Sequence, residues 1–204
     1  MLFPDQVETY QRDGYLILED VLSPAQTSAL DEQVRKIAAR QTDFPEASLE
    51  FEPGAASGGM DTLRKINGCC VHDPFFVDHA RHPSLLGAAV DLLGPDVKLF
   101  GDQLFVKPPG GIEKTYHQDS PYFTIEPMAM VTAWVAIDEV TLDNGCMWVI
   151  PGSHKLDLME HENPDWEHLN IGYFGVKELE GKEGRVHLEM EAGDLCLFHP
   201  QLVH

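Results

Sequence analysis

Residues 130–154 read MVTAWVAIDEVTLDNGCMWVIPGSH, and residues 193–204 read GDLCLFHPQLVH. Both stretches contain short runs of β-branched, aromatic and other apolar residues separated by turn residues, which is the pattern of an all-β core. Asn144-Gly145 lies between two of these runs, and such a pair tolerates the positive φ angles of a tight turn, so we predict a hairpin there. The same composition predicts further strands within residues 97–107, 113–119 and 185–190.

The N-terminal half shows helical patterns instead. Ser23-Pro24 places a capping hydroxyl before a proline at the first helical position, and apolar residues then recur at helical spacing. Residues 43–60 are rich in Gly, Pro, Ser and acids without sustained periodicity, which predicts a loop, either a lid or an ordinary surface excursion. We predict helices over residues 5–13, 24–40 and 83–94, and a strand over residues 15–22.

Helices followed by many short strands indicate an α+β fold whose strands close into a barrel or jelly roll. A length of 204 residues suits one substantial core rather than two domains. We therefore expect a single domain over residues 1–204. Its helical part, with the first strands, is expected in residues 1–95 and its jelly-roll core in residues 96–204.

Charge and cysteine content restrict the possible partners. With 14 Lys and Arg against 34 Asp and Glu, the formal charge is -20, which disfavours nucleic acid and anionic lipid surfaces. The four cysteines show no CxxC spacing, which fits reduced thiols in a cytoplasmic compartment. The first residues lack a signal-peptide pattern, and no apolar stretch reaches the ~20 residues of a membrane span.

His117-Gln118-Asp119 is the motif that points to chemistry. In an extended segment, residues two apart project on the same face, so the imidazole of His117 and the carboxylate of Asp119 would lie side by side. Gln118 would point the other way. An imidazole and a carboxylate supply two of the three ligands of a 2-His-1-carboxylate facial triad, which leaves part of the metal open. His-x-Asp alone is a weak signal, because most such tripeptides lie on surfaces.

The order of motifs makes the signal specific. His-x-Asp is followed by a strand containing Trp134, by Asn144-Gly145, by the run from Pro151 to His154, and by Gly193-Asp194 before His204. This order resembles the phytanoyl-CoA dioxygenase family, and the early segment GYLILEDVLS also resembles the family's start. The resemblance covers nearly the whole chain. It implies a double-stranded β-helix, a cupin-like jelly roll, with N-terminal helices packed outside.

The resemblance also implies the ligands and the cofactors. His117, Asp119 and His204 would be the metal-binding and catalytic residues of an Fe(II)-dependent, 2-oxoglutarate-dependent dioxygenase that uses O2. Such an enzyme hydroxylates a C–H bond of a small molecule and releases succinate and CO2. Asp119 implies hydroxylation, because related iron halogenases have a small residue in place of the carboxylate.

Two other histidines compete with His204 for the distal ligand position. His199 directly follows the strand DLCLF, and Pro200 makes its side-chain direction uncertain. His154 lies in a Pro-Gly-Ser turn and is expected to make a structural hydrogen bond. The family pattern favours His204. We assign the remaining histidines to the surface or the core: His72, His79, His82, His161, His168 and His187.

Matching family positions suggest Lys65, Gln103 and Trp134 as contacts of 2-oxoglutarate. Lys65 offers a cationic partner to a carboxylate, although a lysine on a strand is more often solvated. Trp134 would shape the pocket, although a core tryptophan in a sheet is equally expected.

Two further expectations concern the end of the chain and the alternatives. The family places an arginine, which binds the distal carboxylate of 2-oxoglutarate, and a closing strand beyond His204. We therefore expect a missing last strand, an open sheet edge and poor turnover by these 204 residues. The alternatives are a cupin-like metal enzyme without 2-oxoglutarate and a non-catalytic small-molecule binder on the same fold.

Overall fold

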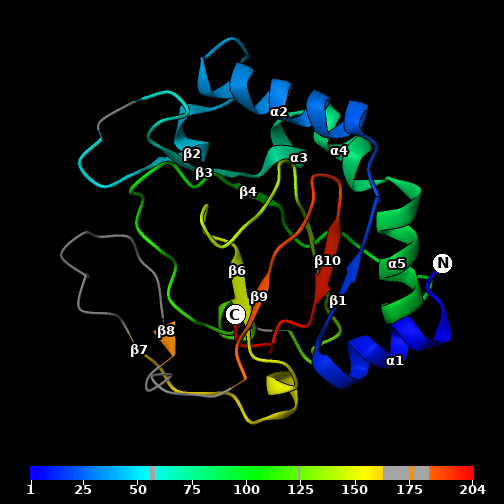
Figure 1. Ribbon diagram of the computed structural model, residues 1–204. Helices are drawn as coiled ribbons and strands as arrows, with labels where there is room; N and C mark the ends of the chain where they lie inside the picture. The colour runs from blue at the N-terminus through cyan, green and yellow to red at the C-terminus, as the bar shows by residue number, and fades with distance from the viewer. Residues whose placement is uncertain (56–57, 124, 163–174, 177–183) are drawn as a thin grey trace.

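The computed structural model describes residues 1–55, 58–123, 125–162, 175–176 and 184–204 (Figure 1). Its helices are α1 (Pro4–Asp13), α2 (Pro24–Ala38), α3 (Cys69–His72), α4 (Pro74–Ala80) and α5 (Pro83–Leu93). Its first strands are β1 (Tyr15–Leu18), β2 (Leu49–Phe51), β3 (Leu63–Asn67), β4 (Gln103–Phe105) and β5 (Thr132–Val135). The later strands are β6 (Met147–Val149), β7 (His161–Glu162), β8 (Gly175–Val176), β9 (Val186–Leu188) and β10 (Leu195–Phe198).

The three predicted helices form where local signals placed them. Helix α2 begins after Ser23 with Pro24 at its first position, and the side chain of Gln26 accepts a hydrogen bond from the Ser23 N–H. Leu30, Val34 and Ile37 are buried, because their spacing puts them on one face. The short helices α3 and α4 were not predicted, since each is too brief to show a period in the sequence.

The central sheet has the order β1-β10-β5, with antiparallel pairing throughout. Strand β10 lies in the middle, and all four of its residues are buried. Because side chains alternate along a strand, Leu195 and Leu197 face one way, whereas Cys196 and Phe198 face the other. The two faces contribute to two different hydrophobic clusters. Strand β1, which pairs with β10, joins the N-terminal part of the chain to this sheet.

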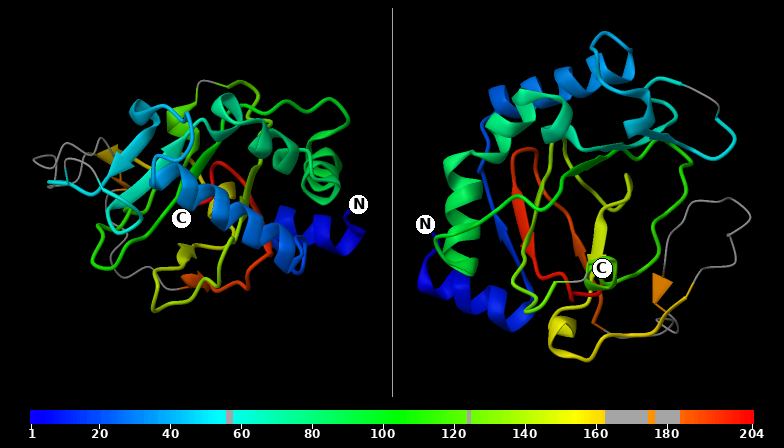
Figure 2. Two further views of the ribbon diagram at one scale, coloured as in Figure 1. Left: turned by 90° about the horizontal axis from the view of Figure 1, so that it is seen from above. Right: turned by 180° about the vertical axis from the view of Figure 1, so that it is seen from behind.

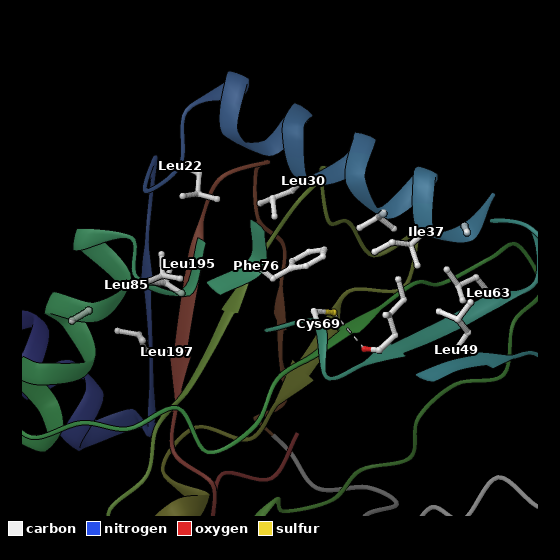
Figure 3. Close-up of a cluster of buried hydrophobic side chains, with 14 of the residues drawn as sticks. Leu22, Leu30, Ile37, Leu49, Leu63, Cys69, Phe76, Leu85, Leu195 and Leu197 are labelled. Atoms are coloured by element: carbon white, nitrogen blue, oxygen red, sulfur yellow. Dashed lines mark hydrogen bonds between the residues drawn. The ribbon is translucent and has the colours of Figure 1, made fainter. Parts of the chain in front are cut away.

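The larger cluster lies between the helices and the sheets. Figure 3 shows its side chains gathered beneath α2, with Leu195 and Leu197 of β10 on one side and Leu49 and Leu63 of β2 and β3 on the other. The dashed line in that figure joins the Cys69 thiol to the Ile66 carbonyl. The N-terminal helices thus cover one face of the β structure, as the views of Figures 1 and 2 show.

The predicted hairpin at Asn144-Gly145 is wrong, although a turn does form there. Gly145 has a φ of 90°, and the Cys146 N–H donates to the Thr141 carbonyl at 2.8 Å. The flanking strands do not pair with each other, because β5 pairs with β10 and β6 pairs with β9. The chain changes sheets at this turn. Local turn chemistry was therefore correct, but strand partners are chosen by burial over longer range.

The predicted loop over residues 43–60 is also wrong in part. It contains a 3-10 turn (Glu46–Ser48) and strand β2, which pairs antiparallel with β3 in the sheet β2-β3-β4. Leu49 is buried in the larger cluster, and this burial stabilises a strand that its polar neighbours concealed in the sequence. Residues 56–57 lie outside the described part.

The C-terminal segment runs into the interior. In Figure 1 and in both views of Figure 2 the C-terminus lies near the middle of the molecule, whereas the N-terminus lies at its rim. The Ile150 N–H donates to the Val203 carbonyl at 3.0 Å, which fixes this segment against the end of β6. No helix in the described ranges combines the length and apolar character that crossing a bilayer requires.

Candidate metal centre

Two segments that are distant in the sequence bring three side chains together near the C-terminus: His117, Asp119 and His204. One potential ligand atom from each lies within 4.8 Å of the other two. His117 Nε2 is 3.4 Å from Asp119 Oδ1, and His204 Nε2 is 3.9 Å from the same oxygen. Both imidazole side chains are 7% exposed. The cluster is therefore shielded, and its ligand atoms point at a common place.

Backbone pairing explains why these residues meet. The His117 N–H donates to the His204 carbonyl at 2.9 Å, and the His204 N–H donates to the His117 carbonyl at 3.0 Å. The Ser120 N–H also donates to the Pro200 carbonyl at 2.8 Å. Segments 117–120 and 200–204 thus run together without forming a regular strand. The expected strand over 113–119 is absent: residues 113–118 form no regular element, and Asp119 has helical angles and precedes the 3-10 turn Ser120–Tyr122.

Both imidazoles are held with Nε2 directed at the carboxylate. His117 Nδ1 lies 3.0 Å from the Thr115 carbonyl oxygen, and His204 Nδ1 lies 2.9 Å from the Leu202 carbonyl oxygen. A carbonyl can only accept, so Nδ1 carries the proton in each neutral ring and Nε2 keeps its lone pair. Such second partners orient metal-binding histidines and fix their tautomer.

The electrostatics of the cluster favour the forms that bind cations. Burial acts to raise the pKa of Asp119, but the adjoining His117 and His204 side chains outweigh it and lower that pKa below its ordinary value. Burial, together with His117, lowers the pKa of His204 to about 4. A carboxylate and a neutral imidazole are therefore present near neutral pH, and both are metal ligands.

Gln118 points away from the cluster, as predicted, but its position is more specific than the sequence indicated. It is fully buried, its Nε2 donates to the Gln201 carbonyl at 2.8 Å, and its Oε1 accepts from the Met159 N–H at 2.9 Å. The Gln118 N–H donates to His161 Nε2 at 3.0 Å. Gln118 thus ties the segment of His117 to that of His204, and His161 contacts the motif although no sequence signal marked it.

The two histidines that competed with His204 lie elsewhere. His199 donates its backbone N–H to the Gly14 carbonyl at 2.9 Å, and its ring lies 5.3 Å from that of His154 between centroids. His154 makes the structural contact that was expected, from Nε2 to the Gln11 carbonyl at 3.2 Å. Neither belongs to the ligand cluster of the described residues. His168 lies outside the described part of the chain.

The predicted contacts of 2-oxoglutarate occupy different surroundings. Trp134 and Thr132 share a face of β5, and the Thr132 hydroxyl lies 3.5 Å from Asp119 Oδ2, so that face leads to the cluster. Lys65 lies 3.8 Å from Glu50 and near the Phe105 ring. Gln103 is exposed on β4 opposite Asn67. Their roles stay predictions.

Lys114 is a charged neighbour that the sequence did not single out. Its ammonium lies 5.2 Å from the Tyr122 ring centre, and that ring is 6.1 Å from the ring of His117. Burial lowers the pKa of Lys114 to about 8, against the attraction of Asp119. A cation close to the ligand cluster would attract anionic ligands in this otherwise acidic chain.

Comparison with known proteins assigns the chain to a family. The sequence model of the phytanoyl-CoA dioxygenase (PhyH) family matches residues 10–204, which is nearly the whole chain. The chain belongs to the phytanoyl-CoA dioxygenase family. It is 29% identical over 218 residues to a probable phytanoyl-CoA dioxygenase of Caenorhabditis elegans and 29% identical over 212 residues to the peroxisomal phytanoyl-CoA dioxygenase of Homo sapiens.

Coverage differs between this chain and those relatives. The alignments include 100% and 98% of this chain, but 70% of the nematode protein and 62% of the human one. EctD from S. alaskensis, solved with 2-oxoglutarate and 5-hydroxyectoine, superposes with a TM-score of 0.79 at 26% identity, covering 99% of this chain and 69% of EctD. Its iron-bound form gives 0.78 at 27% identity, covering 100% of this chain and 70% of EctD.

These similarities confirm several predictions. The family, the α+β jelly-roll fold class, the oxygenase class and the cofactor set of iron and 2-oxoglutarate agree with the family model and the solved neighbours. The division of the chain at residue 95 stays a prediction. The same holds for the expected closing strand and arginine beyond His204, and for the cytoplasmic location.

Proposed function

We propose that this protein is an Fe(II)- and 2-oxoglutarate-dependent dioxygenase that hydroxylates a C–H bond of a small molecule. The observation that carries the proposal is the convergence of His117, Asp119 and His204, with two Nε2 lone pairs beside one carboxylate. This donor set is that of a facial triad, in which the remaining coordination positions stay open for substrate and O2. Family membership supports the proposal.

The donor atoms fit iron(II) by their chemistry. Nitrogen from imidazole and oxygen from carboxylate suit a divalent ion of intermediate softness, and the absence of thiolates from the cluster disfavours a structural zinc site. When bound, iron and 2-oxoglutarate supply the oxidising chemistry, with release of succinate and CO2. The reaction that this implies places one oxygen atom of O2 in the product and the other in succinate.

The residues of this chain have three tasks in that reaction. His117, Asp119 and His204 hold the ion, and the Thr115 and Leu202 carbonyls keep the two imidazoles in the required tautomer. Burial of the imidazoles limits access of water to one side of the site. We propose Lys65, Gln103 and Trp134 as contacts of 2-oxoglutarate, with Trp134 best supported because its face of β5 leads to Asp119.

Substrate and location are proposed at a coarser level. EctD was solved with 5-hydroxyectoine, a hydroxylated small molecule, which supports a small-molecule substrate here. The formal charge of -20 disfavours nucleic acid as a partner. Free thiols at Cys69, Cys70, Cys146 and Cys196 support a reducing compartment such as the cytoplasm.

Anaerobic titration tests the metal site first. Iron(II) should bind the chain in a one-to-one ratio, and addition of 2-oxoglutarate should produce the visible charge-transfer absorption of a chelated 2-oxo acid. His117→Ala, Asp119→Ala and His204→Ala should each remove both signals, whereas the matched variant His199→Ala should retain them. Metal binding that survives all three ligand substitutions would reject the proposed centre.

Turnover then separates the oxygenase from its alternatives. Incubation of a metabolite extract with protein, iron(II), 2-oxoglutarate and O2 should give, at the low rate expected of these 204 residues, a product that has gained one oxygen atom, with succinate in equal amount. A cupin-like enzyme would form product without succinate. A pure binder would form neither, and its ligand affinity would not require His117 or Asp119.

A further inference from the structure

The turn Pro151 to His154 is a motif that the ligand set leaves without a role. Within it, Ser153 is 1% exposed, and its hydroxyl accepts a hydrogen bond from the Val203 N–H at 2.8 Å. The Val203 carbonyl in turn accepts from the Ile150 N–H at 3.0 Å. Both backbone groups of Val203 are thus bound by residues 150–153. Val203 itself is fully buried, so water cannot readily replace these partners.

Val203 immediately precedes His204, and its anchorage therefore bears on the ligand. His204 is paired through its own N–H and carbonyl with His117, and its ring Nδ1 is held by the Leu202 carbonyl. Residues 202–204 are consequently fixed from two sides, by His117 and by the 150–153 turn. The backbone pairing with His117 sets the position of His204 relative to the other ligands. The hydrogen bonds from residues 150–153 hold Val203, the residue before it, in place.

The turn is itself attached to the N-terminal helix. The Gly152 N–H donates to the Asp13 carbonyl at 2.7 Å, and His154 Nε2 contacts the Gln11 carbonyl at 3.2 Å. Gly152 has a φ of 78°, a left-handed conformation that favours glycine. This turn therefore contacts both the end of α1 and the segment before His204.

We propose that Ser153 is a positioning residue for the distal metal ligand, acting on His204 through the Val203 N–H. This rests on the proposed role of His204 in metal binding. Loss of the hydroxyl leaves a buried N–H without its partner, and the backbone that carries the imidazole is then free to shift. Partners that orient metal ligands typically change metal affinity by about 10- to 100-fold when removed.

Cobalt(II) titration of the purified chain provides the test, because cobalt reports affinity and ligand geometry together. Ser153→Ala should raise the Kd for cobalt(II) by about tenfold or more and alter the shape of its visible absorption. Ser153→Thr keeps a hydroxyl and should restore both. Ser120→Ala is the matched control: Ser120 is also buried, it adjoins Asp119, and its hydroxyl has no hydrogen-bond partner among the described residues.

A purely structural role gives a different result. In that case Ser153→Ala would lower the melting temperature while the cobalt(II) Kd and spectrum of the folded protein stayed as in the wild type, and the proposal would be overturned. If Ser153→Ala does not fold, Ser153→Cys, which keeps a weak acceptor, should show the same spectral change in smaller measure. An unchanged spectrum in that variant would equally overturn it.

The His204 and Ser153 variants together separate the metal centre from the role of Ser153. If His204→Ala binds cobalt(II) as the wild type does, the metal centre itself is wrong. If His204→Ala loses the metal while Ser153→Ala keeps wild-type affinity and spectrum, the centre stands and only the role of Ser153 is rejected.

Discussion

The two faces of strand β10 are supported in different ways. Leu195 and Leu197 enter a large apolar cluster beneath the helices, where contacts are numerous and not directional. On the opposite face, Phe198 joins the smaller cluster, and its ring lies 4.7 Å from the ring of His204. Beyond Phe198 the chain is held by hydrogen bonds from defined backbone groups. The helical face supplies stability, whereas the metal end specifies geometry.

This difference gives separate expectations for the two regions. Apolar packing tolerates changes of shape at constant volume, but it loses free energy when volume is removed. A ligand cluster depends on the direction of each bond, so small displacements change metal affinity more than they change overall stability. Four experiments separate the effects on stability from the effects on metal affinity.

The largest effect is expected in the helical cluster. Leu197 is fully buried, and Leu197→Ala should lower the free energy of unfolding by about 2–5 kcal/mol, as lost transfer energy and a cavity combine. Urea denaturation measures this. The exposed Leu86 provides the control, since Leu86→Ala should change stability by less than about 0.5 kcal/mol. A tenfold weaker metal affinity in folded Leu197→Ala would contradict the separation of the two regions.

Metal binding to the cluster of His117, Asp119 and His204 should stabilise the folded protein. At a free metal concentration of 100 times Kd, the free energy of unfolding should rise by about 2.7 kcal/mol, and a chelator should remove the gain. Thermal and urea denaturation with and without metal measure it. Asp119→Ala should show no gain. The effects of Leu197→Ala and of metal should add, because Leu197 belongs to the helical cluster whereas His204 lies against Phe198 of the opposite face of β10. Strong non-additivity would argue against independence.

A change at Gln118 should affect mainly the metal. Gln118→Leu replaces the amide with an apolar side chain of similar size and leaves the Gln201 carbonyl and the Met159 N–H without their partners. We expect Kd for iron(II) or cobalt(II) to rise by about 10- to 100-fold. Gln41 is exposed, so Gln41→Leu serves as the control. Equal affinities of the two variants would show that Gln118 fills space only.

The smallest effect is expected at the corner between α1 and β1. Gly14 has a φ of 82°, and an added Cβ would overlap with His154 Nδ1. Gly54 has a similar φ of 85°, but a Cβ added there would have no neighbour within 4 Å among the described residues, so this position reports backbone strain alone. Gly54→Ala should cost about 1–2 kcal/mol of stability. Gly14→Ala should lower the free energy of unfolding by more than Gly54→Ala does in the same urea assay. Equal losses would show that His154 does not oppose a Cβ at residue 14.

Much of the site could be predicted from sequence because its ligands lie in short motifs. His117 and Asp119 are two residues apart, and the residues from Trp134 to His154 follow in an order that one family shares. The local signals of Ser23 and Pro24 likewise predicted the start of α2. Its predicted end, residue 40, lies two residues beyond the observed end at Ala38. These features depend on neighbours in the chain, and such information is present in one dimension.

The errors arose where distant segments decide the outcome. A turn forms at Gly145, but β5 and β6 separate to pair with β10 and β9. Strand β2 forms in a polar stretch because β3 lies beside it. Asp119 reaches the cluster from helical rather than extended backbone angles. In each case pairing and burial outweigh local propensity, which is a weak determinant of strands.

The sequence by itself determined the family, the helices with clear caps and the three candidate ligands, with His204 favoured over His199 by the family pattern. Only the tertiary structure shows which of these two histidines lies beside His117, because both lie in one short segment and their backbone partners separate them: His204 pairs with His117, whereas His199 pairs with Gly14. It also revealed Gln118, His161 and Ser153 as parts of the support. Hydrogen bonds between segments distant in the chain create these roles, and no local pattern encodes such bonds.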